Sequence, residues 1–496
     1  MLCFAWSKAK EVRMQRRDFL KAVGVGAASF LVGGCGGASI QPSGKAAKRK
    51  PNFVFIFIDD LGYKDLAFMG SKYYETPNID KLASEGVVFT NAYSNAPNCA
   101  PTRACLMSGQ YTPRHGIYTV GSPERGKAKL RKLIPTPNTT ELSPDIVTIP
   151  EALKAGGYRS ACIGKWHLGE KEPFRPQDQG FDVVYERTKR SHFTDDGEYL
   201  TDRLTTEAVN FIESNKDNPF FLYLSHHAVH TPIQAKPEMI EKYKAKEPIG
   251  GHDNPKYAAM IESVDESVAM VLAALDRLGL RDNTVVFFFS DNGGYANVTS
   301  MLPLRGSKGM LYEGGIRVPA IVRCPGHTKL GSVCDSPVIG IDFYPTMLDM
   351  AGVKNPKGYI LDGRSITTLL DDESAGFESA KKKFNNRAIF WHFPAYLEPY
   401  NDSQKPWRTT PASAIRKGPW KLIEFFEDGR TELYNLENDI SEKNNLAASM
   451  PKKASQLHAE LKRWQTQLNA PVPKQLNSGY DPAARAAQTP SSSQPN

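Results

Sequence analysis

The chain has 496 residues, of which 40% are hydrophobic, and a formal net charge of +8 at pH 7. This length exceeds what one minimal core needs, and it predicts a large domain with a smaller one attached. The positive charge is local, because residues 1–50 contain ten Lys and Arg against only Glu11 and Asp18. Residues 51–496 are neutral on balance, so we expect no nucleic-acid partner bound by charge alone.

The N-terminal segment has the organisation of an export signal. The pair Arg16-Arg17 precedes an apolar run over 22–32, which is shorter than the roughly 20 residues of a membrane-spanning helix. Paired arginines in this place are typical of a twin-arginine export signal, and the alternative is a disordered basic leader. Val-Gly-Gly-Cys, ending at Cys35, is similar to a lipoprotein cleavage site. We therefore expect an exported protein, periplasmic or at the outer surface, with a signal over 1–35, a linker over 36–50 and Cys35 as a candidate lipid anchor.

From residue 51 onward, short apolar stretches alternate with helical patterns. The expected buried strands are Phe53–Ile58, Arg159–Ile163, Phe220–Leu224 and Thr284–Phe289, and the expected helices include segments that start near Pro77 and Thr148 and a long amphipathic one over Tyr257–Leu278. This alternation predicts an α/β fold with a largely parallel sheet covered by helices on both faces.

After about residue 375 the pattern changes to short antiparallel strands with polar turns. The expected strands are Arg387–His392, Ala412–Arg416, Trp420–Phe426 and Thr431–Leu436, followed by a helix over Pro451–Leu468. We therefore expect a main domain over 51–375 and a smaller α+β subdomain over 376–470. The remaining residues, 471–496, are rich in Ser, Pro, Gln and Ala, and this composition predicts a disordered tail.

The seven cysteines form neither a dense disulfide framework nor a zinc-ligand spacing. Cys324 and Cys334 flank a Pro-Gly turn. Their spacing is compatible with a disulfide across the turn in an oxidising compartment and equally with two separate half-buried thiols.

Acidic and amide side chains follow two of the expected strands. Asp59 and Asp60 come directly after the first strand, and Asp291 and Asn292 come just after Thr284–Phe289. Ligands of α/β sheets bind beyond the carboxyl ends of the strands, so these side chains are expected to converge there. Alone, each pair is more often a turn or a helix cap, but together the hard oxygen donors favour calcium or magnesium over zinc.

The segment around Cys99 predicts a thiol held at the start of a helix. Pro101 stands where a first helical residue would, and Arg103 lies one turn inside. Free N–H groups at a helix N-terminus attract anions. On spacing alone, Cys99 is either a reactive thiol of lowered pKa or a small buried hydrophobic residue.

These residues resemble a known family. Cys99-x-Pro101-x-Arg103 with Leu-Met-Ser-Gly after it resembles the signature of type I, formylglycine-dependent sulfatases, in the alkaline phosphatase superfamily. Further segments resemble that family in order along the chain: Gly164-Lys165-Trp166-His167-Leu168-Gly169, Val229-His230-Thr231-Pro232, Ser290-Asp291-Asn292-Gly293, Leu304-Arg305-Gly306 through Lys308 to Pro319, and the C-terminal segments 416–422 and 432–436. The resemblance implies an alkaline-phosphatase-like fold and an arylsulfatase-type sulfuric ester hydrolase.

The resemblance also implies roles for individual residues. Cys99, oxidised to formylglycine by a formylglycine-generating enzyme, would be the nucleophile. The residues implied to bind one calcium ion are Asp59, Asp60, Cys99, Asp291 and Asn292, and the other implied catalytic residues are Arg103, Lys165, His167, His230 and Lys308. The cation and the three basic side chains would offset negative charge on the transferring sulfate.

The implied chemistry assigns different steps to the two histidines. Hydrated formylglycine carries two hydroxyls on one carbon, of which one attacks sulfur and the other then releases sulfate. His167 would be the base for that release, and His230, with Lys308 as its partner, would protonate the leaving alcohol. Taken alone, His167 could equally be a packed histidine, and the two lysines would default to solvated side chains.

The implied substrate is a sulfated glycan or polysaccharide. Two alternatives remain: a formylglycine-dependent phosphodiesterase or phosphonate monoester hydrolase on the same scaffold, and a non-catalytic glycan-binding protein in which Cys99 is not oxidised. The sugar, the linkage, exo or endo action and the oligomeric state cannot be read from the sequence.

Overall fold

The computed structural model describes residues 49–488. The predicted export signal, Cys35 and nearly all of the predicted linker lie outside this range. Among the described residues, no helix is both long and apolar enough to cross a membrane. Residues 50–488 belong to one compact unit.

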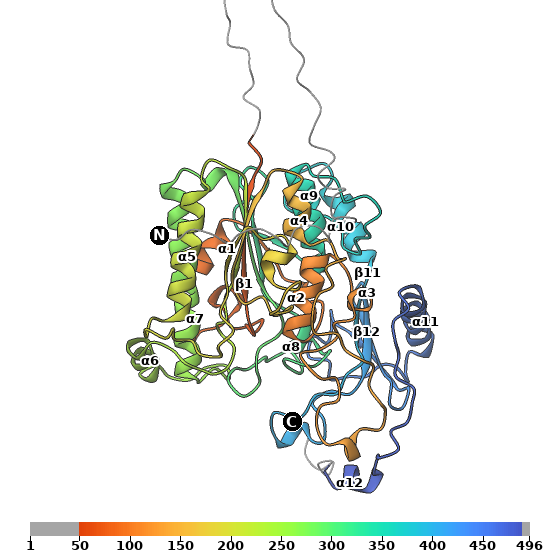
Figure 1. The fold of residues 1–496 in the computed structure, drawn as a ribbon. Coiled ribbons are helices and arrows are strands. Elements are labelled where there is room, and N and C mark those ends of the chain that lie inside the picture. Colours follow the sequence, from red (N-terminus) through yellow and green to blue (C-terminus); the bar gives the residue numbers. More distant parts are fainter. Residues whose placement is uncertain (1–48, 489–496) are drawn as a thin grey trace, which may run out of the picture. The chain divides into compact units, whose positions relative to one another are not determined.

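A mixed, mostly parallel sheet of eight strands lies at the centre of the described residues, with the order β5-β4-β6-β1-β7-β8-β2-β9 (Figure 1). Only β8 runs antiparallel to its neighbours, β7 and β2. The strands are β1 (Asn52–Ile58), β2 (Val87–Phe89), β4 (Arg159–Gly164), β5 (Val183–Tyr185), β6 (Phe220–Ser225), β7 (Thr284–Ser290), β8 (Ala320–Arg323) and β9 (Ser332–Cys334). The predicted fold class and the four predicted strands are confirmed.

The central strands are apolar on both faces because helices cover both faces. Phe53, Phe55 and Phe57 of β1 belong to the hydrophobic core on one side, and Val54 and Ile56 belong to the core on the other. This alternation follows from the two-residue period of a strand. On the first face the ring of Phe57 stacks on that of Phe289, with centroids 6.0 Å apart.

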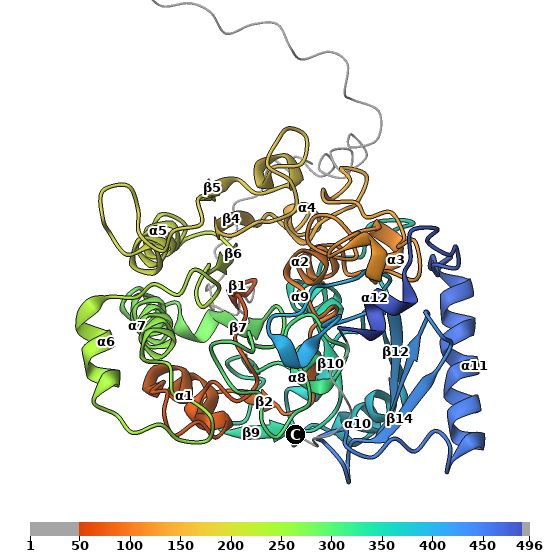
Figure 2. The same ribbon diagram turned by 90° about the horizontal axis from the view of Figure 1, so that it is seen from below.

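Helices from distant parts of the chain form the two covering layers. In Figures 1 and 2, α5 and α7 lie on the side of the sheet opposite to α2 and α9. The longest helix, α7, begins at Pro255, where the Asn254 side chain caps the backbone N–H groups of Lys256 and Tyr257. The helices are α1 (Pro77–Ser84), α2 (Cys99–Ser108), α3 (Thr112–His115), α4 (Ile149–Lys154), α5 (Leu200–Ser214), α6 (Pro237–Lys244), α7 (Pro255–Arg277), α8 (Glu313–Ile316) and α9 (Phe343–Ala351).

The C-terminal part contains a four-stranded antiparallel sheet in the order β11-β12-β13-β14, as predicted. Helix α11 packs against it, and Trp464 of this helix stacks on Phe390 of β11 with ring centroids 4.7 Å apart. The remaining elements are β3 (Ala92–Tyr93), which pairs with β10 (Val338–Ile339), α10 (Phe377–Asn386), β11 (Ala388–Phe393), β12 (Ala412–Lys417), β13 (Trp420–Phe425), β14 (Thr431–Asn435), α11 (Pro451–Gln467) and α12 (Pro482–Ala486).

The prediction of a disordered tail is wrong for residues 471–488. Leu476 pairs with Leu133, and the Asn477 side chain donates hydrogen bonds to the carbonyls of Ala128 and Arg131. The polar composition suggested that the segment has too little apolar surface to fold. Instead, hydrogen bonds and an ion pair between α12 and Glu427 hold residues 471–488 against the preceding part of the fold. Residues 489–496 lie outside the described range.

Candidate active site

The carboxyl ends of four adjacent parallel strands supply most of the candidate site. Lys165 follows β4, the loop that carries His230 follows β6, Asp59 follows β1, and Asp291 follows β7. Because these strands are neighbours and run in the same direction, the residues that follow them meet at one edge of the sheet. This edge lines a cavity of about 700 Å³.

The acidic residues after β1 and β7 contact one another directly. Ile58 and Ser290 are paired in the sheet, so Asp60 and Asp291 are close. The Asp60 backbone N–H donates to Oδ1 of Asp291 over 3.0 Å, and Nδ2 of Asn292 donates to Oδ1 of Asp60 over 2.8 Å. Asp60 has a left-handed φ of 64°, which is uncommon for a residue with a side chain. The structure thus brings together the two acidic strand ends.

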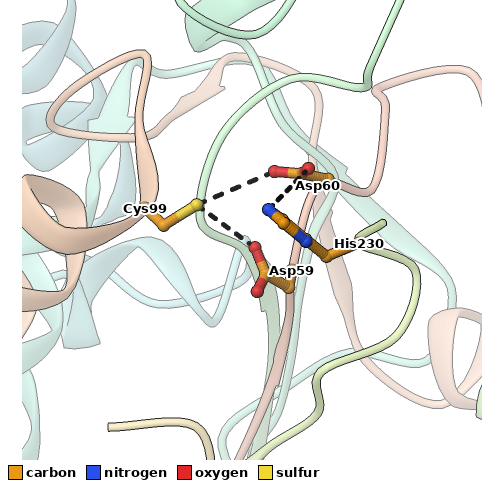
Figure 3. A group of neighbouring side chains, drawn as sticks. All are labelled: Asp59, Asp60, Cys99 and His230. Carbon is orange, nitrogen blue, oxygen red and sulfur yellow. Dashed lines mark hydrogen bonds and ion pairs between the residues drawn. The ribbon is translucent and has the colours of Figure 1, made fainter. Parts of the chain in front are cut away.

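Cys99 is the first residue of α2 and faces the carboxylates of Asp59 and Asp60 (Figure 3). The helix begins two residues before the predicted position, Pro101, because the Asn98 side chain accepts a hydrogen bond from the backbone N–H of Cys99. The Sγ of Cys99 lies 3.3 Å from Oδ1 of Asp59 and 3.8 Å from Oδ1 of Asp60. Burial, followed by the charge of Asp59, raises the pKa of this thiol well above its usual value. The unmodified thiol is therefore neutral, which agrees with the alternative of a small buried residue and not with that of a reactive thiol of lowered pKa.

Three basic side chains surround the carboxylates. Nη2 of Arg103 lies 2.9 Å from Oδ2 of Asp291, and Lys165 pairs with Asp59. Nζ of Lys308 lies 2.6 Å from Oδ1 of Asp60 and 3.3 Å from Sγ of Cys99. Burial opposes ionisation of Asp59, but Lys165, His230 and Arg103 hold the pKa of that carboxyl well below its usual range. Asp59 therefore stays charged at neutral pH.

Lys165 is positioned by the glycine before it. Gly164 has a φ of 104°, and a Cβ there would lie 1.9 Å from the carbonyl oxygen of Ser225 on β6. Only glycine allows this close approach of β4 to β6. The backbone N–H of Lys165 then donates to the same Ser225 carbonyl over 2.8 Å, which fixes the point where the chain enters the cavity.

The two predicted catalytic histidines both line the cavity. Burial, followed by repulsion from Lys165, lowers the pKa of His167 well below its usual value, and its buried Nδ1 has no hydrogen-bond partner among residues 49–488. His167 is thus neutral and can accept a proton. Nδ1 of His230 lies 2.6 Å from the Thr231 carbonyl, which can only accept, so Nδ1 donates and Nε2 is left facing Asp60 at 3.7 Å.

Sequence reasoning missed several residues that share this cavity. His227 lines its wall, and Nε2 of His192 contacts the His230 carbonyl at 2.8 Å, which makes His192 a donor that supports the His230 loop. Glu186 also lines the cavity, and burial raises its pKa to about 7. Arg408 comes from the C-terminal part of the chain. The adjacency of His192 to Ser191 in a polar loop was a weak signal for one of these residues, and no sequence motif marks the others.

The carboxylate and amide oxygens of the site suit a hard divalent cation, whereas the thiol of Cys99 and the ring of His230 are softer donors. Asp59, Asp60, Cys99 and His230 each offer a ligand atom, and these atoms lie within 4.8 Å of one another (Figure 3). Asp291 lies behind them, and burial together with the charge of Asp59 raises its pKa to about 7. Oδ1 of Asn292 is buried without a hydrogen-bond partner in the described part of the chain. A buried group of carboxylates with an unpaired amide oxygen is what a calcium or magnesium ion would satisfy.

Two family models and two known proteins match this chain, and all four are sulfatases or sulfatase domains. The sulfatase family matches residues 51–353, and the C-terminal domain described as N-sulphoglucosamine sulphohydrolase, C-terminal, matches residues 307–470. A protein named Sulfatase from Formosa agariphila is 35% identical over 86% of this chain and 91% of its own length. N-acetylgalactosamine-6-sulfatase from Mus musculus is 32% identical over 70% of this chain and 69% of its own length.

A solved structure gives the same result for the fold. The crystal structure of Ps i-CgsB in complex with k-i-k-neocarrahexaose has a TM-score of 0.71 and 29% identity, covering 89% of this chain and 97% of that one. The alkaline-phosphatase-like fold predicted from the motifs is confirmed. With the family match spanning residues 51–353 and a 35% identical relative aligned over most of both chains, the protein belongs to the sulfatase family and is a sulfuric ester hydrolase.

Proposed function

We propose that this sulfatase removes sulfate from a sulfated glycan, with formylglycine derived from Cys99 as nucleophile and one calcium ion as cofactor. The observation that carries the proposal is the position of the Cys99 side chain, buried between two carboxylates and the Lys308 ammonium. Its neutral thiol is a poor nucleophile, which favours a role as the precursor of a modified residue.

The calcium ion would be held by Asp59, Asp60, Asp291 and Asn292 together with residue 99, and His230 offers a further nearby ligand atom. Bound there, it would supply positive charge to the sulfate oxygens. The modified residue 99 would supply two hydroxyls on one carbon.

Other side chains of the site would have separate roles in charge compensation and proton transfer. Lys165 and Lys308 line the cavity and offset charge on the sulfate, while Arg103 holds Asp291 and Asp59 from behind. His167, neutral and with an unpaired ring nitrogen, is suited to take a proton from the hydroxyl of residue 99.

His230 is suited to give a proton to the leaving alcohol only when its Nε2 is protonated. Burial and the nearby Lys308 lower its pKa, whereas Asp60 favours the charged ring. The net reaction consumes one water and yields sulfate and the free alcohol.

A glycan substrate is supported by the relatives and by the cavity. The Ps i-CgsB structure holds k-i-k-neocarrahexaose, and the cavity of this chain, lined by polar and charged side chains, has room for a sugar. For the N-terminal segment we propose export through the twin-arginine signal and lipid attachment at Cys35, which mass measurement of the membrane fraction from the native host would test.

The decisive test combines mass spectrometry and assays. Peptide mass of the Cys99 segment from the native host should show the oxidised residue. An aryl sulfate should be hydrolysed in preference to an aryl phosphate diester or a phosphonate monoester. The reverse preference would assign the chain to the phosphate alternative, and an unoxidised Cys99 without turnover would indicate a glycan-binding protein.

The metal is tested separately. After chelation, calcium should restore activity and magnesium should restore it poorly, because the oxygen-rich, flexible ligand set suits the larger ion. Asp291→Ala should abolish metal retention, measured by elemental analysis of the purified protein. Full recovery with magnesium alone would exclude calcium as the working metal.

A further inference from the structure

One wall of the cavity comes from the C-terminal part of the chain. Residues 396–409, the outer hairpin, fold back so that Leu397 and Thr409 pair in antiparallel fashion. The indole N–H of Trp407 donates to the Leu130 carbonyl over 3.1 Å, which fixes the hairpin against the loop after Gly121. Leu397, Tyr400 and Arg408 of the outer hairpin line the cavity.

Arg408 is an unusual member of this wall because its charge is buried without a matching anion. Its side chain packs over the Tyr400 ring at 3.5 Å, and the residue is only 9% exposed. Its Nε and Nη1 atoms are buried and have no hydrogen-bond partner among residues 49–488. Buried guanidinium N–H groups without partners are costly, so such a group at a cavity wall indicates a ligand that supplies acceptors.

The charged groups that face Arg408 do not neutralise it. Glu398 is engaged by Arg125, whose Nε lies 3.1 Å from Oε2 of Glu398. Burial, followed by repulsion from Arg125, lowers the pKa of Arg408 to about 9, while Glu398 and Asp60 partly oppose this shift. The guanidinium therefore remains charged at neutral pH.

The guanidinium is close to the reaction centre. A Cβ on Gly309 would lie 2.7 Å from Nε of Arg408, so the arginine rests against the backbone next to Lys308. Lys308 in turn contacts Sγ of Cys99 at 3.3 Å. An anionic group on the sugar that carries the reactive sulfate, or on its neighbour, can therefore reach Arg408 while the sulfate is at residue 99.

We propose that Arg408 determines specificity by binding a second anionic group of the substrate, either another sulfate ester or a carboxylate, beside the sulfate that is hydrolysed. Carboxylates and tetrahedral oxyanions such as sulfate esters can accept two hydrogen bonds from a guanidinium, and they compensate its charge, which a neutral sugar hydroxyl does not do. The proposal rests on the proposed glycan sulfatase function and narrows it to substrates with two neighbouring negative groups.

The test compares matched substrates. The probes are 4-nitrophenyl sulfate, carrageenan oligosaccharides with one or two sulfates per disaccharide, and chondroitin sulfate disaccharides with the carboxylate intact or reduced. In at least one of these pairs, the wild-type protein should hydrolyse the doubly anionic substrate faster than the substrate that lacks the second anion. Arg408→Gln should reduce this preference by roughly 10- to 100-fold. Hydrolysis of 4-nitrophenyl sulfate should change less than twofold, and Arg408→Lys should recover part of the preference.

A matched control and a binding measurement keep the test independent of turnover. Arg430 also stacks on an aromatic ring, that of Phe425 at 3.8 Å, but it does not line the cavity. Arg430→Gln should leave the preference unchanged. Calorimetry with Cys99→Ala, which cannot complete turnover, should show the same preference in affinity and its loss in Cys99→Ala/Arg408→Gln.

The outcomes separate the possibilities. A preference for the doubly sulfated oligosaccharide would identify the second anionic group as a sulfate ester. A preference for the disaccharide with the intact carboxylate would identify it as a carboxylate. An equal loss on every substrate, including 4-nitrophenyl sulfate, would mean that Arg408 only supports the Lys308 loop and would overturn the proposal. The absence of any preference in the wild-type protein, by turnover and by calorimetry, would also overturn it. Preference in binding without sulfate release by the wild-type protein would refute the proposed function but not this inference.

Discussion

Two buried groups of charged side chains in this protein differ in their access to the cavity. The pocket cluster contains Asp59, Asp60, Asp291, Arg103, Lys165 and Lys308. The junction cluster joins α8 to the C-terminal sheet and contains Glu313, Arg317, Lys421 and Glu442. Both are built partly from segments that carry the resemblance to sulfatases.

In the junction cluster every carboxylate oxygen lies close to a partner, although Oε1 of Glu442 meets Lys421 as an ion pair without a hydrogen bond. Nζ of Lys421 lies 3.0 Å from Oε1 of Glu313 and 2.8 Å from Oε1 of Glu442. The Tyr93 hydroxyl donates to Oε2 of Glu313, and the Glu313 backbone N–H donates to Oε2 of Glu442, each over 2.7 Å. This cluster does not line the catalytic cavity.

In and beside the pocket cluster some polar atoms remain unsatisfied, and of their residues His167 lines the cavity. Within residues 49–488, Oδ1 of Asn292, Nε of Arg103 and Nδ1 of His167 have no hydrogen-bond partner. The comparison teaches that burial of charge alone does not identify a reactive site. What distinguishes the pocket cluster is that Asp59, Asp60, Lys165 and Lys308 line the cavity, whereas the junction residues do not.

The largest expected effect is the loss of turnover in Cys99→Ser. In a host whose modifying enzyme accepts only cysteine, the serine hydroxyl can attack sulfur once but has no second hydroxyl with which to release sulfate. We expect at most one turnover per enzyme, with intact-mass measurement showing a trapped sulfate ester or an unmodified serine. Cys99→Ala should fold and show only background activity.

The matched control for this prediction is Cys105→Ser, in the same helix α2. Cys105 is buried and contacts His115, outside the cavity. It should keep multiple turnover. Sustained turnover by Cys99→Ser with a serine of unmodified mass would rule out the formylglycine mechanism.

A smaller effect is expected from His230→Ala, and it should depend on the leaving group. Removing a general acid costs about 10²- to 10⁴-fold for a poor alcohol leaving group, whereas an activated phenol needs little protonation. The measurement is kcat/KM on a sugar sulfate and on 4-nitrophenyl sulfate. His167→Ala, assigned to sulfate release, should not discriminate between them in this way, and equal losses in His230→Ala would exclude His230 as the acid.

The third prediction compares the two clusters by replacing one lysine of each with methionine. Lys421→Met leaves Glu313 and Glu442 without their shared cation, so the free energy of unfolding should fall by about 3–5 kcal/mol. The kcat of the fraction that stays folded should be unchanged. Lys308→Met should lower kcat by about 10²- to 10³-fold, because it removes a charge aimed at the sulfate.

Denaturant unfolding and activity, measured on both variants, check this prediction. A loss of activity in Lys421→Met that exceeds its loss of folded protein would connect the junction cluster to catalysis. A loss of stability in Lys308→Met as large as in Lys421→Met would remove the distinction between the clusters.

The inner part of the site could be predicted because its placement follows from local rules. Asp59 and Asp291 follow apolar strands, and neighbouring parallel strands end at the same edge. The helix start at Cys99 was displaced by two residues because Asn98 supplies the cap that Pro101 was expected to mark. The roles of these residues stay predictions until the variants are measured.

The outer part of the site could not be predicted because it depends on contacts between distant segments. Arg408 reaches the cavity only because the outer hairpin packs on the loop that contains Leu130. The same holds for the segment after residue 470, whose polar composition indicated disorder although Leu476 and Asn477 find partners in the loop over 128–133. Composition describes a segment alone, and these contacts depend on the surface it meets.

The smallest expected effect concerns the pH dependence of the junction cluster. Burial raises the pKa of Glu442 to about 7, although Lys421 opposes the shift, whereas the model-compound value is 4.5. Between these values the unfolded chain loses the proton first, so stability should fall as the pH rises from 4.5 to 7. Glu442→Gln removes this loss, so its free energy of unfolding relative to wild type should rise between pH 5 and pH 8 by at most about 3 kcal/mol. The Gln oxygen can still accept the Glu313 backbone N–H. Denaturant unfolding at both pH values with calcium held constant measures the difference. A difference that does not change with pH would show that Glu442 is ionised throughout.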